Sequence, residues 1–506
     1  MSASQAIPPL APEPADTERG ARANRPARSR LRGERRLVAI IAPALIALAA
    51  AELVWTRLIM LPQGLWGDEA YSVFVYIRGG PDVIWSAARW IPNNHMLFEA
   101  LTWATNGILG AHVEATDRLW SVIPAIAAAA LMTWWLWRRI DRWEAAIFAV
   151  LATVAPLYFD LGVQARGYGL GFLAAALTLI AADRAARSAA RSDFLLLGVG
   201  GFVGMATLQD FLPQFLGTAA VLFALCPAVR RRLVITVIGT GAVTLAWYAP
   251  VLSKILGYNN PYGVPLPWYG FITAPLRDLF GQSISSLDPS VSVTAGAIVA
   301  GVVLAAGIAE LWRRRERRLA ALLLVPVICT YLTIEVATGY LPRFVSFVML
   351  DLLALAAIGL GGAGRQVFRS RRLVLPAAVV LVVCSGLALG RFFHYSTVYA
   401  QVPFEAAKTA GQIINGAQEA PGPVVTNHAL TAFSDYISPH PVRTVGPAAL
   451  VHMFCAYRGR FVYLEQELFG PYPDTACLTR RGSFRIALQE RRSQVWLWMV
   501  PAITNP

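Results

Sequence analysis

Apolar residues along this chain gather in long runs that short polar segments separate. A run of about 20 apolar residues is the length that crosses the hydrocarbon core of a bilayer as a helix. We expect each run that approaches this length to span a membrane, which gives about eleven transmembrane helices. The runs cover residues 37–55, 118–137, 143–160, 167–182, 194–208, 211–227, 233–250, 291–311, 319–338, 345–362 and 373–390.

The loop between the first two runs, residues 56–117, contains three short amphipathic pieces at 69–79, 81–91 and 96–110. The third piece is apolar enough to resemble a span. At about fifteen residues it has the length of an interfacial or re-entrant helix instead. We therefore place all three pieces at the membrane surface.

The charges of the chain support this assignment. Only 15% of the 506 residues are charged and 56% are hydrophobic, whereas a soluble domain carries about 25% charged residues. The net charge of +14 comes from arginine clusters between the apolar runs. If 96–110 stays at the surface, every arginine cluster falls on the cytosolic side, as the positive-inside rule requires. This distribution fits a polytopic membrane protein better than a nucleic-acid-binding protein.

The composition divides the chain into three parts. Residues 1–36 contain eight arginines and four acidic residues, and this composition predicts a disordered basic tail in the cytosol. Residues 37–390 form the membrane domain, whose second large external loop covers 251–288. Residues 391–506 are polar enough to form a small α/β domain outside the cytosol.

The pattern of this C-terminal part predicts one amphipathic helix and several strands. The helix covers 403–416, and the strands are 424–425, 460–464 and 495–500. Cys455 and Cys477 are the two cysteines in this polar region, and an oxidising compartment would allow them to form a disulfide. Their spacing does not show that they are close, so the pairing stays open.

Polar residues collect on the external side of the predicted spans. Asp68 and Glu69 follow the first span, where two adjacent carboxylates are costly unless they face a watery cavity. Asp68 could alternatively cap the helix that begins at Glu69. The other polar residues at this side include Asn94, His95, Gln164, Arg166, Tyr168, Asp210, Lys254 and Arg343. We expect an outward-facing cavity to be the functional site.

Four motifs in chain order carry a resemblance to a known family. They are Asp68-Glu69 in Trp-Gly-Asp-Glu-Ala-Tyr, Asn94-His95-Met96-Leu97, Val163-Gln164-Ala165-Arg166-Gly167-Tyr168, and Arg343-Phe344. With this topology, the chain resembles the integral-membrane glycosyltransferases of the GT-C superfamily. It is similar to the branch of the protein O-mannosyltransferases and the lipid A aminoarabinose transferase.

The chain departs from the family pattern at two places. Relatives often carry His-Pro-Pro-Leu where this chain has His95-Met96-Leu97, so both prolines are missing. Gln164 stands where relatives carry a glutamate. The loss of that charge weakens a metal-binding role, and no metal site is assigned, although a divalent cation stays open.

The resemblance implies a donor sugar on a polyprenyl phosphate and an acceptor hydroxyl on a cell-envelope glycan, glycolipid or protein. Transfer would invert the anomeric centre at the outer face of a bacterial cytoplasmic membrane. Asp68 is the candidate general base, and Glu69 would hold the acceptor, hold a cation or orient Asp68. Arg166 and Arg343, with Lys254 as a weaker third, are the candidates for the donor phosphate.

The remaining candidates would bind substrate: Asn94, His95, Gln164, Tyr168 and Asp210. Each assignment has a simpler alternative. The two arginines could anchor span ends at the interface, and Tyr168 could belong to an aromatic belt. His95 could serve only as a hydrogen-bonding helix start, and Asp210 could be a cap.

Two other functions remain as alternatives. A lipid or glycolipid flippase would place charges near the middle of the bilayer, whereas here they cluster on one side. Another external membrane transferase, such as a phosphoethanolamine transferase, would require a metal-binding soluble domain. The sequence of residues 391–506 shows no metal-ligand spacing.

Overall fold

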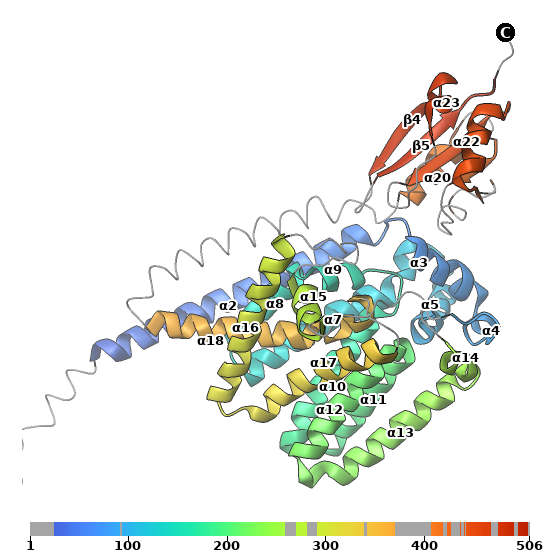
Figure 1. The fold of residues 1–506 in the computed structure, drawn as a ribbon. Helices are drawn as coiled ribbons and strands as arrows, with labels where there is room; N and C mark the ends of the chain where they lie inside the picture. The colour runs from blue at the N-terminus through green and yellow to red at the C-terminus, as the bar shows by residue number, and fades with distance from the viewer. Residues whose placement is uncertain are drawn as a thin grey trace, which may run out of the picture.

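The computed structural model describes residues 25–91, 94–258, 270–280, 291–337, 342–369, 406–417, 422–426, 436, 440, 442–466, 474–489 and 494–503. They form a bundle of helices and a smaller domain built on a sheet (Figure 1). The sheet domain, coloured orange to red in Figure 1, lies beyond the end of the bundle where α3, α4 and α5 gather.

Each predicted apolar run up to 345–362 contains a helix of the bundle, although the run 143–160 is divided into two helices at Ala155, before Pro156. The last run, 373–390, lies outside the described residues. The helices are α2 (Arg25–Met60), α7 (Leu119–Arg139), α8 (Arg142–Val154), α9 (Pro156–Leu161), α10 (Tyr168–Ser188), α11 (Arg191–Thr207), α12 (Leu212–Leu225), α13 (Arg230–Tyr248), α14 (Leu252–Leu256), α15 (Gly270–Phe280), α16 (Val291–Arg313), α17 (Arg317–Ala337) and α18 (Met349–Arg369). Helix α2 begins at Arg25, inside the segment expected to be a disordered tail.

Several of these helices are long and apolar enough to cross a bilayer alone. Among the described residues there are 5, namely Ile40–Met60, Leu119–Arg139, Tyr168–Ser188, Arg317–Ile334 and Arg343–Gln366. Helices α12 and α13, each with the turn that precedes it, qualify as a pair bent by 115°. The protein is therefore a multi-pass, largely helical membrane protein, and the number of eleven spans stays a prediction.

The loop after α2 contains short helices, as its amphipathic pattern predicts. They are α3 (Gly67–Tyr71), a π-helical turn at Ser72–Ile77, α4 (Pro81–Ile84), α5 (Met96–Leu109) and α6 (Glu114–Asp117). Helix α5 has 14 residues and ends at Leu109; the next residue, Gly110, has a φ of 61°, a left-handed cap that glycine adopts without strain. Its length agrees with an interfacial helix and not with a span.

The C-terminal domain is an α/β unit with a mixed five-stranded sheet. The strands are β1 (Val424–Thr426), β2 (Val442–Thr444), β3 (Phe461–Gln466), β4 (Phe484–Gln489) and β5 (Gln494–Val500), in the order β2-β1-β3-β5-β4. Strand β1 pairs in parallel with β2 and β3, whereas β5 pairs antiparallel with β3 and β4. The sequence analysis missed β2 and β4. Strand β2 has three residues and little burial, so it leaves almost no hydrophobic pattern.

Alternating residues of the sheet face two different helical layers. Val424, Val462 and Leu464 pack in the cluster that contains helix α20 (Ala407–Asn415). Their neighbours Val425 and Tyr463 pack in the cluster of helices α22 (Pro447–Ala456) and α23 (Ala476–Arg480). Because side chains alternate across a strand, the short apolar strands bury both faces of the sheet.

The C-terminal domain is docked on the loop after α2. The hydroxyl of Tyr436 accepts a hydrogen bond from Leu65 N at 2.8 Å and donates one to the Glu114 carboxylate at 3.1 Å. Lys408 Nζ lies 2.7 Å from the same carboxylate. The loop that carries Asp68 and Glu69 is thus held from the bundle on one side and from this domain on the other.

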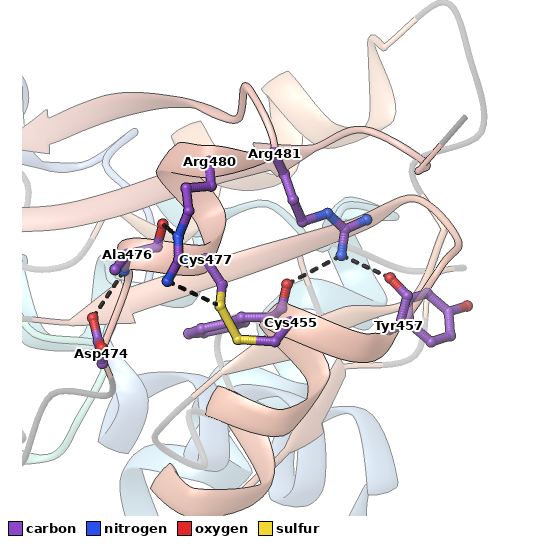
Figure 2. Close-up of a disulfide and its surroundings, with 8 residues drawn as sticks. Cys455, Tyr457, Asp474, Ala476, Cys477, Arg480 and Arg481 are labelled. Atoms are coloured by element: carbon purple, nitrogen blue, oxygen red, sulfur yellow. Dashed lines mark hydrogen bonds between the residues drawn. A yellow bond between two sulfur atoms is a disulfide. The ribbon is translucent and has the colours of Figure 1, made fainter. Parts of the chain in front are cut away.

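Cys455 of α22 and Cys477 of α23 form a disulfide, with their Cα atoms 5.2 Å apart (Figure 2). The sequence left this pairing open. Beside the bond, Arg481 Nη1 donates to the carbonyl oxygens of Phe454 and Tyr457 at 3.3 and 2.7 Å. The disulfide and this arginine together tie the end of α23 to the end of α22.

We predict that replacing both cysteines by serine lowers the free energy of unfolding of the C-terminal domain by about 2–4 kcal/mol, because the bond closes a loop of 22 residues. Limited proteolysis of the domain at rising urea concentration measures this change. The oxidised wild type and a Cys226→Ser variant, which keeps the bond, serve as controls. Equal urea midpoints for all three proteins would contradict a stabilising disulfide.

Candidate active site

One cavity brings together residues from most of the motifs singled out above. Its volume is about 80 Å³, which is smaller than that of most sites that enclose a whole small molecule. Its walls come from the segment before α5, the turn at the start of α10, the end of α11 with the 3₁₀ turn Gln209–Phe211, the segment after α14, and the 3₁₀ segment Pro342–Val348. The lining residues are Asn94, His95, Arg166, Tyr168, Thr207, Leu208, Gln209, Asp210, Tyr258, Arg343 and Phe344.

Asp68 holds the two arginines of this cavity. Its Oδ2 accepts hydrogen bonds from Arg166 Nη1 at 3.1 Å and from Arg343 Nη1 at 2.5 Å. The Arg166 side chain is only 3% exposed, whereas Asp68 and Arg343 are 33% and 24% exposed. Three motifs that lie about a hundred residues or more apart in the chain therefore meet at one carboxylate oxygen.

The turn that carries Arg166 is fixed by close packing. Ser121 Oγ of α7 donates a hydrogen bond to the Arg166 carbonyl. A Cβ at Gly169 would lie 1.9 Å from the Ser121 carbonyl oxygen, and a Cβ at Gly167 would lie 2.2 Å from the Thr207 side chain. The glycines of this motif therefore allow α10 to approach α7 and α11, which places Arg166 in the cavity.

Glu69 faces the protein interior and does not line the cavity. Its Oε1 accepts from Arg118 Nε at 3.1 Å and from Ala165 N at 2.5 Å, and its Oε2 accepts from Arg118 Nη2 at 2.9 Å and from Trp66 N at 3.1 Å. Both side chains are fully buried, at 0% and 1% exposure. These four hydrogen bonds fix the carboxylate of Glu69. Glu69 therefore positions its neighbour Asp68.

His95 lies at the start of α5, beside the two cavity arginines. Burial, and then the positive charges of Arg166 and Arg343, hold the pKa of His95 well below its usual range. Its ring packs edge-on against Tyr168, with the centroids 5.2 Å apart. His95 is therefore a neutral imidazole that can accept or donate a hydrogen bond in the cavity.

The other expected site residues are placed differently. Asn94 lines the cavity, and its amide donates to the Ile84 carbonyl at 2.9 Å. Gln164 is fully buried outside the cavity lining, and its amide has no hydrogen-bond partner among the described residues. Lys254 is exposed on α14 and does not line the cavity. Within the described parts of the chain, no three metal-ligating side chains come together.

The fold can be compared with solved structures. ArnT from Cupriavidus metallidurans in the apo state superposes with a TM-score of 0.57 at 13% identity, over 92% of this chain and 100% of that chain. ArnT from the same organism bound to undecaprenyl phosphate gives a TM-score of 0.53 at 14% identity, over 92% and 98%. This chain has the GT-C fold of ArnT. Its sequence matches no protein-family model and no curated protein.

Within the GT-C fold, the most consequential residue that the sequence analysis missed is Arg118. It donates to Glu69 and also to the carbonyl oxygens of Leu61 and Gly64, both at 3.0 Å. A signal was present, since an arginine that opens a span on the predicted external side runs against the positive-inside pattern. Thr207, Leu208 and Tyr258 were also missed, because nothing in their local sequence separates them from other residues at span ends.

We predict opposite outcomes for two isosteric changes at buried glutamates of this GT-C fold. Burial raises the pKa of Glu99 well above its usual range, which favours the neutral form of its carboxyl. Glu99→Gln then keeps a neutral acceptor for His95 N and shifts the melting temperature little. Glu69→Gln leaves Arg118 as an unpaired buried charge, and we expect a loss of about 3–5 kcal/mol.

Thermal unfolding of both variants in the same detergent measures this difference. Equal melting temperatures for Glu69→Gln and the wild type would show that Glu69 does not hold the loop.

Proposed function

We propose that this protein is a glycosyltransferase that moves a sugar from a polyprenyl phosphate to an acceptor hydroxyl, with inversion at the anomeric carbon. The reaction takes place at the outer face of a bacterial cytoplasmic membrane. The acceptor is a cell-envelope glycan, glycolipid or protein.

The convergence of Arg166 and Arg343 on one cavity of a GT-C fold carries this proposal. The leaving group of such a transfer is a lipid-linked phosphate, whose growing negative charge requires cationic donors in a site of low dielectric constant. Guanidinium groups suit a phosphate because they donate two parallel hydrogen bonds. ArnT, which shares the fold, has been solved bound to undecaprenyl phosphate, and this supports the same class of donor here.

Asp68 keeps the two arginines together while no donor is bound. A donor phosphate competes with its carboxylate for the same guanidinium groups, so binding of the donor releases Asp68 from one or both ion pairs. The sequence assigned the role of general base to Asp68. Its ion pairs with Arg166 and Arg343 support a task at the phosphate subsite before the donor binds.

The external location of the site rests on two observations. The arginine clusters between spans predict that the loops with Asp68 and Arg343 lie outside. The disulfide between Cys455 and Cys477 suits an oxidising compartment, and its domain is docked on the loop that carries Asp68.

We predict that Arg166→Ala and Arg343→Ala each lower kcat/KM for transfer by about 10²–10³, the usual effect of losing one donor to a developing charge. Membranes with equal amounts of each variant receive radiolabelled undecaprenyl phosphates that carry mannose, arabinose, galacturonic acid or aminoarabinose. Transfer of label from the lipid donor to an acceptor fraction is the measurement, and it also identifies the sugar.

Arg89→Ala is the matched control, because Arg89 is exposed on the same external loop and does not line the cavity. It should transfer label at the wild-type rate. No transfer by the wild type from any lipid-linked sugar would refute the glycosyltransferase assignment. Full activity of both cavity variants would refute the phosphate site alone.

A further inference from the structure

A groove on the surface of the bundle is separate from the cavity that holds Arg166 and Arg343. It lies between helices α11 and α13, which pack side by side (Figure 1), and its volume is about 530 Å³. Most of the residues that line it are apolar, and each helix adds one arginine, Arg191 from α11 and Arg232 from α13. The groove therefore combines a hydrophobic lining with two positive charges.

The two arginines lie at the same end of the groove. Arg232 Nη1 donates a hydrogen bond to the carbonyl of Ala189, which is two residues before Arg191. Farther along, Tyr248 near the end of α13 donates to the Met205 carbonyl near the end of α11 at 2.8 Å. The helices therefore run in the same direction. The charged end of the groove is at the start of α11, whereas the end of α11 lines the candidate active site.

The length of the groove matches one leaflet of a bilayer. Its lining extends on α11 from Arg191 to Phe202, and on α13 from Arg232 to Val243. A helix rises roughly 17 Å over such a stretch, which is about half of a hydrocarbon core of about 30 Å. An acyl chain of one leaflet ends near the middle of the bilayer and suits this length. A transmembrane helix of a partner protein would need a groove about twice as long.

The groove is open along its length. Phe194 and Thr240 are buried and form its floor, whereas Leu195 and Ile235 are exposed at its edges. Gly239 also lines the groove, and a Cβ added there would meet no atom within 4 Å. A flexible apolar chain can therefore lie in the groove without displacing the protein.

Within the described residues, no carboxylate forms an ion pair with either arginine of the groove. The acids at this end of α10 and α11 already have other partners. Asp193 pairs with Arg184 and Asp183 pairs with Arg187, both at 2.8 Å. The two groove arginines are also exposed. Uncompensated guanidinium groups beside an apolar groove attract an anionic headgroup, and a phosphate can accept parallel hydrogen bonds from them.

We propose that the groove between α11 and α13 binds one anionic phospholipid, whose phosphate contacts Arg191 and Arg232 and whose acyl chain lies along the apolar lining. This lipid belongs to the leaflet on the side of the bilayer opposite the candidate active site. The site is independent of the proposed transfer reaction and holds a different lipid from the sugar donor.

The test compares two lipids that have the same acyl chains and differ in charge. Purified full-length protein in detergent receives dioleoyl phosphatidylglycerol or dioleoyl phosphatidylcholine, and native mass spectrometry gives the Kd of the first bound lipid. The wild type should bind phosphatidylglycerol more tightly by about tenfold or more, and Arg191→Ala should weaken this binding by about fivefold, the effect of one basic residue at a membrane surface. Arg231→Ala is the matched control, because Arg231 is exposed next to Arg232 and does not line the groove.

A second pair of variants tests the place of the acyl chain. Gly239→Leu puts a side chain into the groove and should weaken binding of both lipids by about tenfold. Gly241→Leu is the matched control, because a Cβ at Gly241 also meets no atom within 4 Å but this residue does not line the groove. It should bind both lipids as the wild type does. Equal melting temperatures of the two leucine variants without added lipid show that both are folded.

Three results would overturn the proposal. Equal affinity of the wild type for the two lipids would show that the groove has no site for an anionic headgroup. Binding of phosphatidylglycerol that Arg191→Ala weakens and Gly239→Leu leaves unchanged would place the lipid outside the groove. A dimer of the wild type that Gly239→Leu dissociates and Gly241→Leu does not would assign the groove to a second copy of the chain.

Discussion

The fully buried ion pair between Glu69 and Arg118 is the interaction on which the candidate site depends. Arg118 comes directly before α7, and Glu69 lies in α3, so the pair fastens the loop after α2 to the bundle. Two charges without water are stable only when hydrogen bonds satisfy both of them, and here the neighbouring main chain does so. Because Asp68 is the next residue to Glu69, this pair decides where the carboxylate at the cavity lies.

Close helix packing determines the other half of the site. Gly167 lets the start of α10 approach α11, and Gly169 lets it approach α7. A larger side chain at either position would displace the turn that places Arg166 in the cavity. Arg343 lies in the 3₁₀ segment before α18, and both arginines form ion pairs with Asp68. A pair of guanidinium groups in such a partly enclosed place has a stronger field than the same pair in water, which suits recognition of a phosphate.

The C-terminal domain contributes to the site indirectly. Tyr436 and Lys408 contact the segment between α2 and α3 and the Glu114 carboxylate, next to the start of α7. The disulfide stabilises a part of the same domain. The loop after α2 therefore contacts both the helical bundle and the C-terminal domain, close to Asp68 and Glu69.

The sequence by itself determined the membrane class, the order of the helices and the motifs that contribute to the cavity, because hydrophobic length and arginine clusters are local properties of the chain. It also indicated the short helix α5, whose pattern is complete within 14 residues. It did not distinguish Asp68 from Glu69, which have the same chemistry and adjacent positions. Only the tertiary structure did so, since Arg118 and Arg166 approach them from distant parts of the chain. For the same reason the place of Asp210 in the cavity wall, the exposed position of Lys254 and the burial of Gln164 were decided by packing, because the surroundings of a side chain depend on which segments meet in space.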